Sequence, residues 1–215
     1  MKSLKIPEAT VMRLSVYSRF LTRVQEKGVV NISSGEIAEG IGGSPAQVRK
    51  DLAYFGEFGT RGVGYNANEL NHHIMKILGL GEKWPVAIIG AGNLGSALTQ
   101  YKGFIDRGFK VVAIFDNDLN KIGLTLNGIP VYSIADMEKI IRELDVKIAI
   151  IAVPAEHAQG VADHLANCNV MAILNFAQHV ISVPEHIELR NVDLAVNLEI
   201  LTFNLSLQKE KDKEK

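Results

Sequence analysis

Apolar side chains in the first eighty residues recur every three or four positions, the spacing that is typical of amphipathic helices. This pattern predicts helices over 7–27, 34–39, 46–55 and 68–80. Ser33 and Ser34, with Glu36 behind them, are expected to cap the start of the second segment. Ser44 precedes a proline just before the third segment, and such a pair is typical of a capped helix N-terminus. The second and third segments, joined by a short glycine-containing turn, therefore predict a helix-turn-helix.

Between the third and fourth helices, residues 58–65 contain three glycines around Arg61. Glycines at this spacing predict a hairpin, and the arginine gives it a basic tip. The helices, the tight turn, the capped basic helix and the hairpin together predict a winged helix-turn-helix domain over 1–80. Residues 79–85 are expected to be the linker to the rest of the chain.

The remaining chain alternates short apolar runs with amphipathic helical segments. Such alternation is typical of an α/β domain with a doubly wound, mainly parallel sheet, and it predicts a Rossmann domain over 84–196. The predicted strands lie at 86–90, 110–116, 129–132, 148–153, 172–175 and 192–196, and the predicted helices at 93–106, 134–143 and 156–166.

Residues 197–208 carry apolar side chains on several sides of a predicted terminal helix. A helix of this kind cannot stay in water, so we expect it to pack against another surface. The last residues, 209–215, alternate lysine with acidic residues and are expected to form a disordered, solvated tail.

Composition and charge narrow the class of protein. The chain of 215 residues is 47% apolar and 22% charged, which is ordinary for globular domains. Its net charge of −1 is unevenly distributed: 1–83 hold 11 basic and 8 acidic residues, whereas 84–208 hold 8 basic and 13 acidic residues. A basic first part on an acidic body gives weak support to nucleic-acid binding.

Nothing in the sequence indicates a membrane, an oxidising compartment or a metal. The longest apolar run, 148–154, is far shorter than the ~20 residues that a membrane helix needs. The N-terminus lacks the apolar core of a signal peptide and the single cysteine, Cys168, fits a reducing compartment, so we expect a cytoplasmic protein. No metal-ligand spacing connects the six histidines, which are His72, His73, His157, His164, His179 and His186.

A glycine motif at the end of the first predicted strand carries the clearest chemistry. In the fingerprint G-x-G-x-x-G the first glycine permits a tight turn, the second lets the backbone approach a pyrophosphate, and the third lets the helix lie close to the sheet. The pyrophosphate is expected on the free amides of the following helix. The motif consists of Gly90, Ala91, Gly92, Asn93, Leu94 and Gly95.

An acidic residue ends the next predicted strand. Asp116 lies 21 residues after Gly95, where a carboxylate would accept hydrogen bonds from the adenosine ribose and repel a 2′-phosphate. The pattern therefore favours NAD(H) over NADP(H). Two alternatives stay open at this point: a glycine-rich turn without a ligand, and a site for another adenosine nucleotide such as coenzyme A.

The candidate DNA contacts follow from the geometry of a helix-turn-helix, whose second helix enters the major groove. The N-terminal half of that helix is expected to meet base edges, and Arg61 is expected in the minor groove. The alternative for Arg49 and Lys50 is a merely solvated helix face. The candidates for base contacts are Ser44, Gln47, Arg49 and Lys50, and those for phosphate contacts are Arg13, Arg19 and Tyr54.

After the last predicted strand only one helix remains, too little to enclose a second substrate, and no general acid–base pair can be placed. The chain is therefore expected not to be an enzyme, and the nucleotide is expected to be a signal rather than a reactant. A small NAD-dependent oxidoreductase with a fused regulatory domain is the competing hypothesis.

Several segments together resemble one known family: 6–7 with 13–14, 32–34, 48–56, 61–66, 90–95, 153–156, 175–177 and 191–194. Through them the sequence resembles the Rex family of bacterial redox-sensing transcriptional repressors over nearly its whole length. Two departures stand out: Gln178 occupies a position where the family often has proline, and Gly42 with Gly43 gives an unusually loose entry to the recognition helix.

The resemblance implies a homodimer in which a C-terminal helix is exchanged between subunits, which would account for the apolar segment 197–208. It also implies binding to double-stranded operator DNA when NADH is scarce and release when NADH is bound. The operator implied by such a dimer is an inverted repeat whose half-site spacing matches the protein.

NADH and NAD⁺ differ at the nicotinamide ring, which is neutral in the first and cationic in the second. An apolar pocket that excludes water penalises the cation more than the neutral ring. We expect such a pocket to be built with the partner subunit's terminal helix. A near-complete switch requires a preference of ~5.5 kcal/mol for one dimer arrangement, which two NADH molecules could share. The residues expected to line the pocket are Tyr101, Pro154, Ala155 and Phe176.

Overall fold

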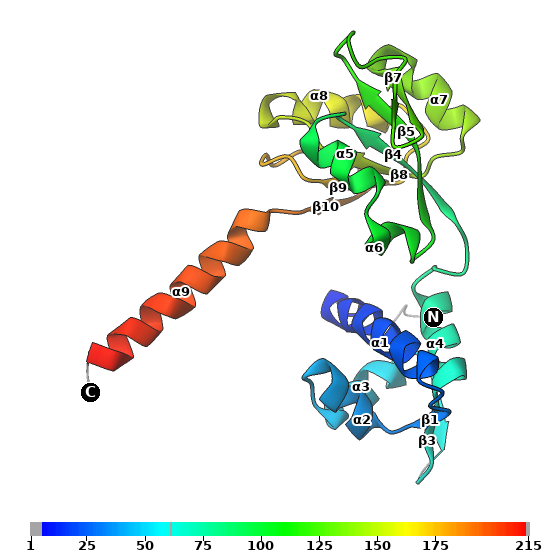
Figure 1. Ribbon diagram of the computed structural model, residues 1–215, viewed down its shortest axis with the longest axis vertical. Helices are drawn as coiled ribbons and strands as arrows, with labels where there is room; N and C mark the ends of the chain where they lie inside the picture. The colour runs from blue at the N-terminus through cyan, green and yellow to red at the C-terminus, as the bar shows by residue number, and fades with distance from the viewer. Residues whose placement is uncertain (1–5, 61, 214–215) are drawn as a thin grey trace. The chain divides into compact units, whose positions relative to one another are not determined.

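The computed structural model describes residues 6–60 and 62–213 and divides the chain into two compact units, Met1–Glu82 and Lys83–Lys215 (Figure 1). The division falls inside segment 79–85, which the sequence marks as a linker. Each unit has a hydrophobic core of its own.

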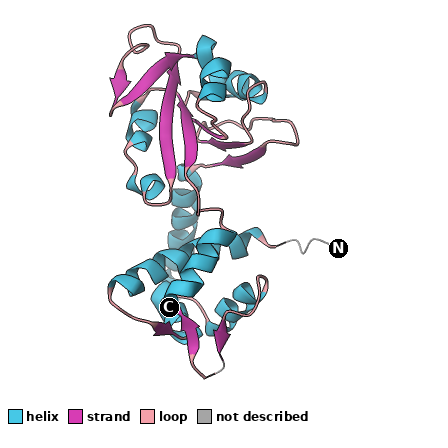
Figure 2. Cartoon of the chain, turned by 90° about the vertical axis from the view of Figure 1, so that its right-hand side faces the viewer, coloured by secondary structure: helices cyan, strands magenta, loops and turns pink. Residues whose placement is uncertain are grey.

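Four helices and a small sheet make up the first unit. Helix α1 packs against α2, α3 and α4, and its fully buried side chains Leu14, Tyr17 and Leu21 lie in the core. The three short strands form an antiparallel sheet with β3 in the middle (Figure 2). The elements are α1 (Glu8–Glu26), β1 (Asn31–Ile32), α2 (Ser34–Ile41), α3 (Pro45–Ala53), β2 (Gly59–Thr60), β3 (Gly64–Asn66) and α4 (Ala67–Ile77). This order is that of the predicted winged helix-turn-helix.

Both helices of the helix-turn-helix begin at the predicted caps. The Ser33 hydroxyl accepts a hydrogen bond from the Glu36 backbone N–H (3.1 Å), and the Glu36 carboxylate accepts one from the Ser33 N–H (2.8 Å). Ser44 caps α3 by accepting from the Gln47 N–H (3.2 Å). Gly42 ends α2 at φ +69°, a left-handed conformation that glycine adopts without strain. The turn therefore favours glycine at position 42, which gives Gly42 a structural role at the end of α2.

The second unit is built on a seven-stranded sheet with the order β10-β9-β8-β4-β5-β7-β6. Neighbouring strands are parallel except β6 and β7, which form a hairpin at one edge. This is a doubly wound order whose switch point lies between β4 and β8. The strands are β4 (Trp84–Ile89), β5 (Phe109–Asp116), β6 (Thr125–Leu126), β7 (Ile129–Ser133), β8 (Ile148–Ile151), β9 (Ala172–Asn175) and β10 (Glu188–Asn191).

Helices cover both faces of this sheet (Figures 1 and 2). On one face, Met137 and Ile141 of α7 and Leu165 of α8 join the larger core. On the other face, Leu98 of α5 and Phe104 of α6 pack over the central strands. The helices are α5 (Asn93–Thr99), α6 (Lys102–Ile105), the 3₁₀ helix η1 (Ile134–Asp136), α7 (Met137–Glu143), α8 (Ala155–Ala166) and α9 (Leu194–Lys213).

Two predicted elements of this unit are wrong in detail. The helix expected over 93–106 is broken into α5 and α6, because the chain leaves helical geometry at Gln100 and Tyr101. The strand expected over 192–196 does not form: the edge strand is β10, and the chain turns into α9 right after it. Asp193 explains the second error, because its carboxylate accepts the Ala195 N–H (2.8 Å) at the start of the helix.

Helix α9 is longer than predicted at both ends. It begins at Leu194 rather than 197, and residues 209–213, expected to be disordered, continue it. This charged end holds neither glycine nor proline, and its lysines and glutamates are good helix formers. Its apolar side chains stay exposed, Leu198 at 65% and Phe203 at 62%. Within the described residues, no helix combines the length and the apolar character needed to cross a membrane.

Candidate functional site

A buried carboxylate ties the recognition helix α3 to α1. Asp51 is fully buried, and its two oxygens accept hydrogen bonds from four side chains. Arg13 donates through Nε (2.6 Å) and Nη2 (2.7 Å), and Tyr17 donates through its hydroxyl (2.6 Å). Thr10 Oγ1 (3.1 Å) and Gln47 Nε2 (2.9 Å) complete the set. The bidentate Arg13 contact fixes the two helices in one relative orientation.

The hydrogen bonds keep this carboxylate charged although it is buried. Burial raises the pKa of Asp51, but the bonds from Arg13, Tyr17, Gln47 and Thr10 outweigh it and lower the pKa to about 2. Burial and the bond to Asp51 raise the pKa of Tyr17 above its usual range. The network is therefore an ion pair with two neutral donors and a phenol that stays protonated at neutral pH.

This network engages two of the residues predicted to contact DNA. Three donor groups, on Arg13 and Gln47, point to Asp51. In the structure these two side chains hold α3 in place. Sequence reasoning missed the residue that they bind, Asp51, which directly follows Arg49 and Lys50. Arg19, predicted for phosphate, is exposed on α1, and the hydroxyl of Ser44 is the helix cap.

A concave surface that encloses a volume of ≈ 750 Å³ lies between α3, the start of α2 and the hairpin. Arg49 lines it and donates to the Ser34 hydroxyl through Nη1 (2.9 Å). Lys50 is exposed and Tyr54 is half-buried on the same helix. Sequence reasoning identified Ser33 and Ser34 as caps and missed that they also line this surface. Arg61, predicted for the minor groove, lies outside the described residues.

The glycine loop after β4 has the close packing that the fingerprint requires. A Cβ on Gly95 would overlap the Gly90 carbonyl oxygen, so no larger residue fits where α5 meets the strand. Gly90 itself has φ +108° and faces the Ala152 carbonyl. Gly92 faces open space at the first turn of α5, where backbone amides are free. Asn93 and Leu94 are exposed in that turn, so the loop can cradle an anionic group.

Asp116 ends β5 beside this loop and is 8% exposed. Its carboxylate accepts the Ala91 N–H (2.7 Å) and the Asp118 N–H (2.8 Å), and the Lys121 ammonium lies 3.4 Å away. Burial raises the pKa of Asp116, but these two backbone donors and Lys121 together lower it below its usual value. The aspartate is therefore anionic and holds the glycine loop as well as its own turn.

A cavity of ≈ 380 Å³ opens at the switch point between β4 and β8. Gly90, Gly92 and Asp116 line one side of it, and Pro154 and His157 line another. Ala155 follows Pro154 as the first residue of α8. Ligands of doubly wound sheets bind in this crevice beyond the carboxyl ends of the strands. The geometry fits a dinucleotide, because Gly92 is the one fingerprint glycine at which a Cβ would meet no atom within 4 Å, and the fingerprint assigns this position to the close approach of a pyrophosphate.

The structure brings two other predicted pocket residues to the opposite face of the sheet. Phe176 is half-buried over the central strands with Leu98 and Phe104, and its N–H donates to the Ile151 carbonyl (2.9 Å). Tyr101 is 54% exposed and stacks edge-on against Phe104. Neither lines the cavity at the switch point.

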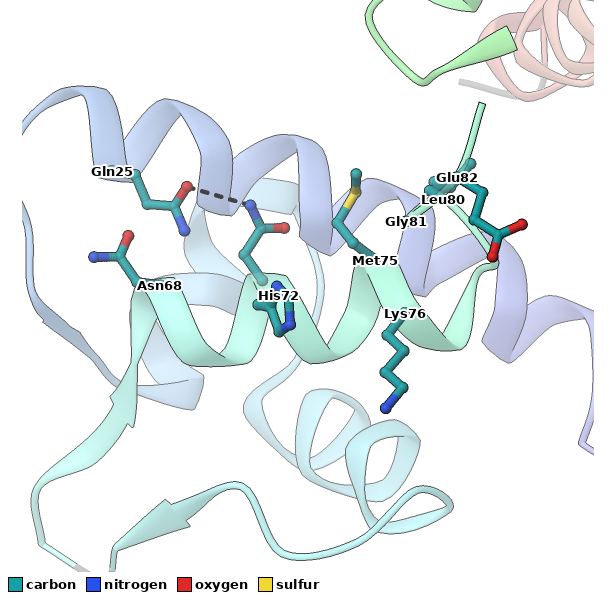
Figure 3. Close-up of a pocket in the computed structure, with 9 residues that line it drawn as sticks. Gln25, Asn68, His72, Met75, Lys76, Leu80, Gly81 and Glu82 are labelled. Atoms are coloured by element: carbon teal, nitrogen blue, oxygen red, sulfur yellow. Dashed lines mark hydrogen bonds between the residues drawn. The ribbon is translucent and has the colours of Figure 1, made fainter. Parts of the chain in front are cut away.

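A separate cavity of ≈ 770 Å³ follows α1 and α4 in the first unit (Figure 3). Asn71 is its buried centre: the amide donates to Thr22 (3.2 Å) and Gln25 (3.3 Å), and its oxygen accepts from Ser18 (2.8 Å). These bonds join the two helices, and the charged residues Lys76 and Glu82 also line the cavity. Across residues 6–60 and 62–213, no cluster of three or more histidine, cysteine or acidic side chains could hold a metal ion.

Two family models match the chain. The model described as "Putative DNA-binding protein N-terminus" matches residues 5–53, and the model described as "CoA binding domain" matches residues 81–179.

Curated relatives match it over nearly its full length. The redox-sensing transcriptional repressor Rex of Desulfitobacterium hafniense is 61% identical, with 97% of this chain and all of the relative covered. The protein of the same name from Pelotomaculum thermopropionicum is 62% identical, with 98% of each chain covered. The one from Streptomyces coelicolor is 48% identical, with 94% of this chain and 79% of the relative covered.

Solved structures agree with these relatives. RSP, a Rex-family repressor crystallised with β-NAD⁺ and operator DNA, superimposes with a TM-score of 0.91 at 36% identity, covering 97% of this chain and 96% of that one. Its complex with β-NADH gives a TM-score of 0.87 at 34% identity, covering 99% and 100%. The two-unit α/β architecture predicted from the sequence is thereby confirmed.

Proposed function

Because this chain belongs to the Rex family of redox-sensing transcriptional repressors, we propose that it binds operator DNA through its first unit and senses NADH through its second. The family consists of regulators, so the nucleotide acts as a signal and the oxidoreductase hypothesis is set aside. The observation that carries the proposal is the match over nearly the whole chain to a repressor bound to both NAD⁺ and operator DNA. We infer a cytoplasmic site of action, where DNA and the NADH pool are both present.

The chain's own residues support the roles of the two sites. The Gly90–Gly95 loop would hold the pyrophosphate, and Asp116 would accept the ribose hydroxyls. Pro154 and Ala155 would form an apolar wall near the nicotinamide, where a neutral ring is favoured over a cation. When bound, the dinucleotide supplies only the charge difference between its two oxidation states.

A gel-shift experiment on an inverted-repeat operator, titrated with NADH at fixed NAD⁺, tests the proposal. We expect NADH to release the DNA and NAD⁺ at the same concentration to leave it bound. Equal release by both nucleotides would refute redox sensing. The match to the "CoA binding domain" model is a reason to test coenzyme A as an alternative ligand. Titrating coenzyme A against bound NADH, followed by NADH fluorescence, shows whether coenzyme A competes for the site.

Arg49→Ala and Lys50→Ala are each expected to weaken operator affinity about tenfold, because each removes a cation from the exposed face of α3. A phosphate contact would also lower the slope of log K against log salt by about one, whereas a base contact would relax sequence preference. Fluorescence anisotropy at several salt concentrations measures both. Lys76→Ala, an exposed cation on α4, is the control and should bind as the parent does.

Asp116→Asn is expected to weaken NADH binding by about ten- to a hundredfold, since it removes the charge that would accept the ribose hydroxyls. It should also narrow the preference for NADH over NADPH, because Lys121, 3.4 Å away, would no longer be neutralised and could pair with a 2′-phosphate. Fluorescence titration with both nucleotides gives the ratio. Adding Lys121→Ala to Asp116→Asn should restore the preference for NADH over NADPH. If the ratio of the two dissociation constants did not change in Asp116→Asn, the assignment of Asp116 to the ribose would be contradicted.

We propose that α9 is a dimer element exchanged between subunits. Apolar side chains such as Leu201, 58% exposed, and Phe203 have no cover within the chain and need a partner surface. Leu201→Glu with Phe203→Glu is expected to convert the dimer to monomers in sedimentation experiments, because two charges would be buried at the interface. Lys211→Ala, in the charged end of the same helix, should leave the dimer intact. A charged double variant that stays dimeric would rule out this surface.

A further inference from the structure

We infer that Asn175 is a positioning residue that couples the cofactor side of the sheet to the root of α9; this rests on the proposed function. Asn175 is the last residue of β9 and is 0% exposed. It does not line the cavity at the switch point. A fully buried carboxamide needs partners for its polar atoms, so those partners indicate what it holds in place.

Two segments, the loop after β9 and the end of β10, meet at this side chain. Its Nδ2 donates to the His179 carbonyl (3.0 Å) and to Asn191 Oδ1 (2.8 Å), and its Oδ1 accepts the Ala177 N–H (3.0 Å). Its backbone carbonyl accepts the Val192 N–H (2.8 Å). One residue therefore joins the loop after β9 to the end of β10, with both amide hydrogens in use.

The first of these segments is hydrogen-bonded to the end of β8, which leads into the cavity at the switch point. Phe176 follows Asn175, and its N–H donates to Ile151 at the end of β8. The next residues of β8's loop, Ala152, Val153 and Pro154, line the cavity at the switch point. A ligand that shifts the end of β8 would therefore displace the loop that Asn175 holds.

The second segment leads into α9. Asn191 ends β10, and α9 begins at Leu194 after Asp193 caps it. The buried amide of Asn175, through its hydrogen bond to Asn191 Oδ1, therefore connects the loop to the helix root. If its partners moved apart, the buried amide would be left with unsatisfied polar atoms, which costs free energy. Its hydrogen bonds therefore favour one relative position of the two segments.

Asn175→Ala removes all three side-chain bonds. In the full-length dimer we would measure the NADH Kd without DNA, the operator Kd without NADH, and the factor by which saturating NADH weakens operator binding. We expect that factor to fall at least about fivefold, while each separate Kd changes less than about threefold. A residue with only a structural role would alter the separate affinities and leave the factor in place.

Gln159→Ala is the matched control, because Gln159 makes two hydrogen bonds to Ser182 further along the same loop and none to β10. Its coupling factor should stay within about twofold of the parent. Asn191→Ala removes a single bond at an exposed residue and keeps the test open if Asn175→Ala fails to fold; its factor should fall in the same direction. Suppose that NADH weakens operator binding of the parent, and that both folded variants show the same coupling factor as the parent. That result would overturn this inference and leave the proposed function standing. A parent whose operator binding ignores NADH overturns the proposed function and this inference with it.

Discussion

Asp51→Asn is expected to lower the free energy of unfolding of the first unit by about 3–5 kcal/mol, because it leaves Arg13 facing an amide in a buried site. The same change weakens the attachment of α3 to α1, so operator affinity should fall even though Asp51 itself is fully buried. Urea denaturation followed by circular dichroism gives the first quantity, and anisotropy with labelled operator gives the second. Tyr17→Phe, which removes one neutral donor, should cost only about 1–2 kcal/mol.

The pH dependence of stability tests the same carboxylate. The pKa of Asp51 is about 2 in the folded protein and near 3.8 without its partners, so the charged form is favoured by folding. Its contribution, about 2 kcal/mol, is complete above pH 4 and is lost as the pH falls toward 2. In Asp51→Asn this part of the acid sensitivity should disappear. An equal loss of stability between pH 4 and pH 2 in both proteins would assign it to other carboxylates.

Gly95→Ala is expected to destabilise the second unit and to abolish measurable NADH binding. The added Cβ would overlap the Gly90 carbonyl, so α5 would have to move away from β4 and carry the pyrophosphate site with it. We expect a loss of about 1–3 kcal/mol in unfolding free energy and at least a hundredfold loss in NADH affinity, or about 2.7 kcal/mol. Denaturation without ligand and NADH fluorescence titration measure the two effects.

Two other glycines separate these effects. Gly92→Ala meets no atom within 4 Å and φ is −80°, so the ligand-free stability should hold while NADH binding weakens, because the methyl would stand where the pyrophosphate approaches. Gly160→Ala, in open space on α8, should stabilise the unit by about 0.5–1 kcal/mol without affecting NADH. If Gly92→Ala bound NADH as the parent does, the proposed location of the pyrophosphate would be wrong.

Local patterns predicted most of the fold. The caps at Ser33 and Ser44 and the apolar runs of the central strands depend on neighbours in sequence, so the sequence alone identifies them. The fingerprint could be interpreted with the same ease, since a strand, a glycine turn and a helix follow one another. The strand expected over 192–196 failed because an aspartate that caps a helix interrupts an apolar pattern just as a strand residue would.

The site was harder to predict where it depends on residues far apart in the chain. Asp51 receives donors from Thr10, Arg13 and Tyr17, 34 to 41 positions away, and no local pattern distinguishes it from a solvated acid. Phe176 follows a strand end and Tyr101 lies in the segment predicted as the first helix of this unit, and both are expected at the nicotinamide. The structure places both near Phe104 and not in the lining of the cavity, so their role in the nicotinamide pocket stays a prediction. The roles of the DNA-facing residues stay predictions.

The strand order also has a consequence for how the protein forms. β4 is the central strand, and its two neighbours are β5, about twenty residues later, and β8, about sixty residues later. During synthesis β4 therefore cannot pair with its second neighbour until residue 151 has been made. The contacts that build the first unit, in contrast, lie within its own 82 residues. In nascent chains the DNA-binding domain should accordingly fold before the nucleotide-binding site that controls it has formed.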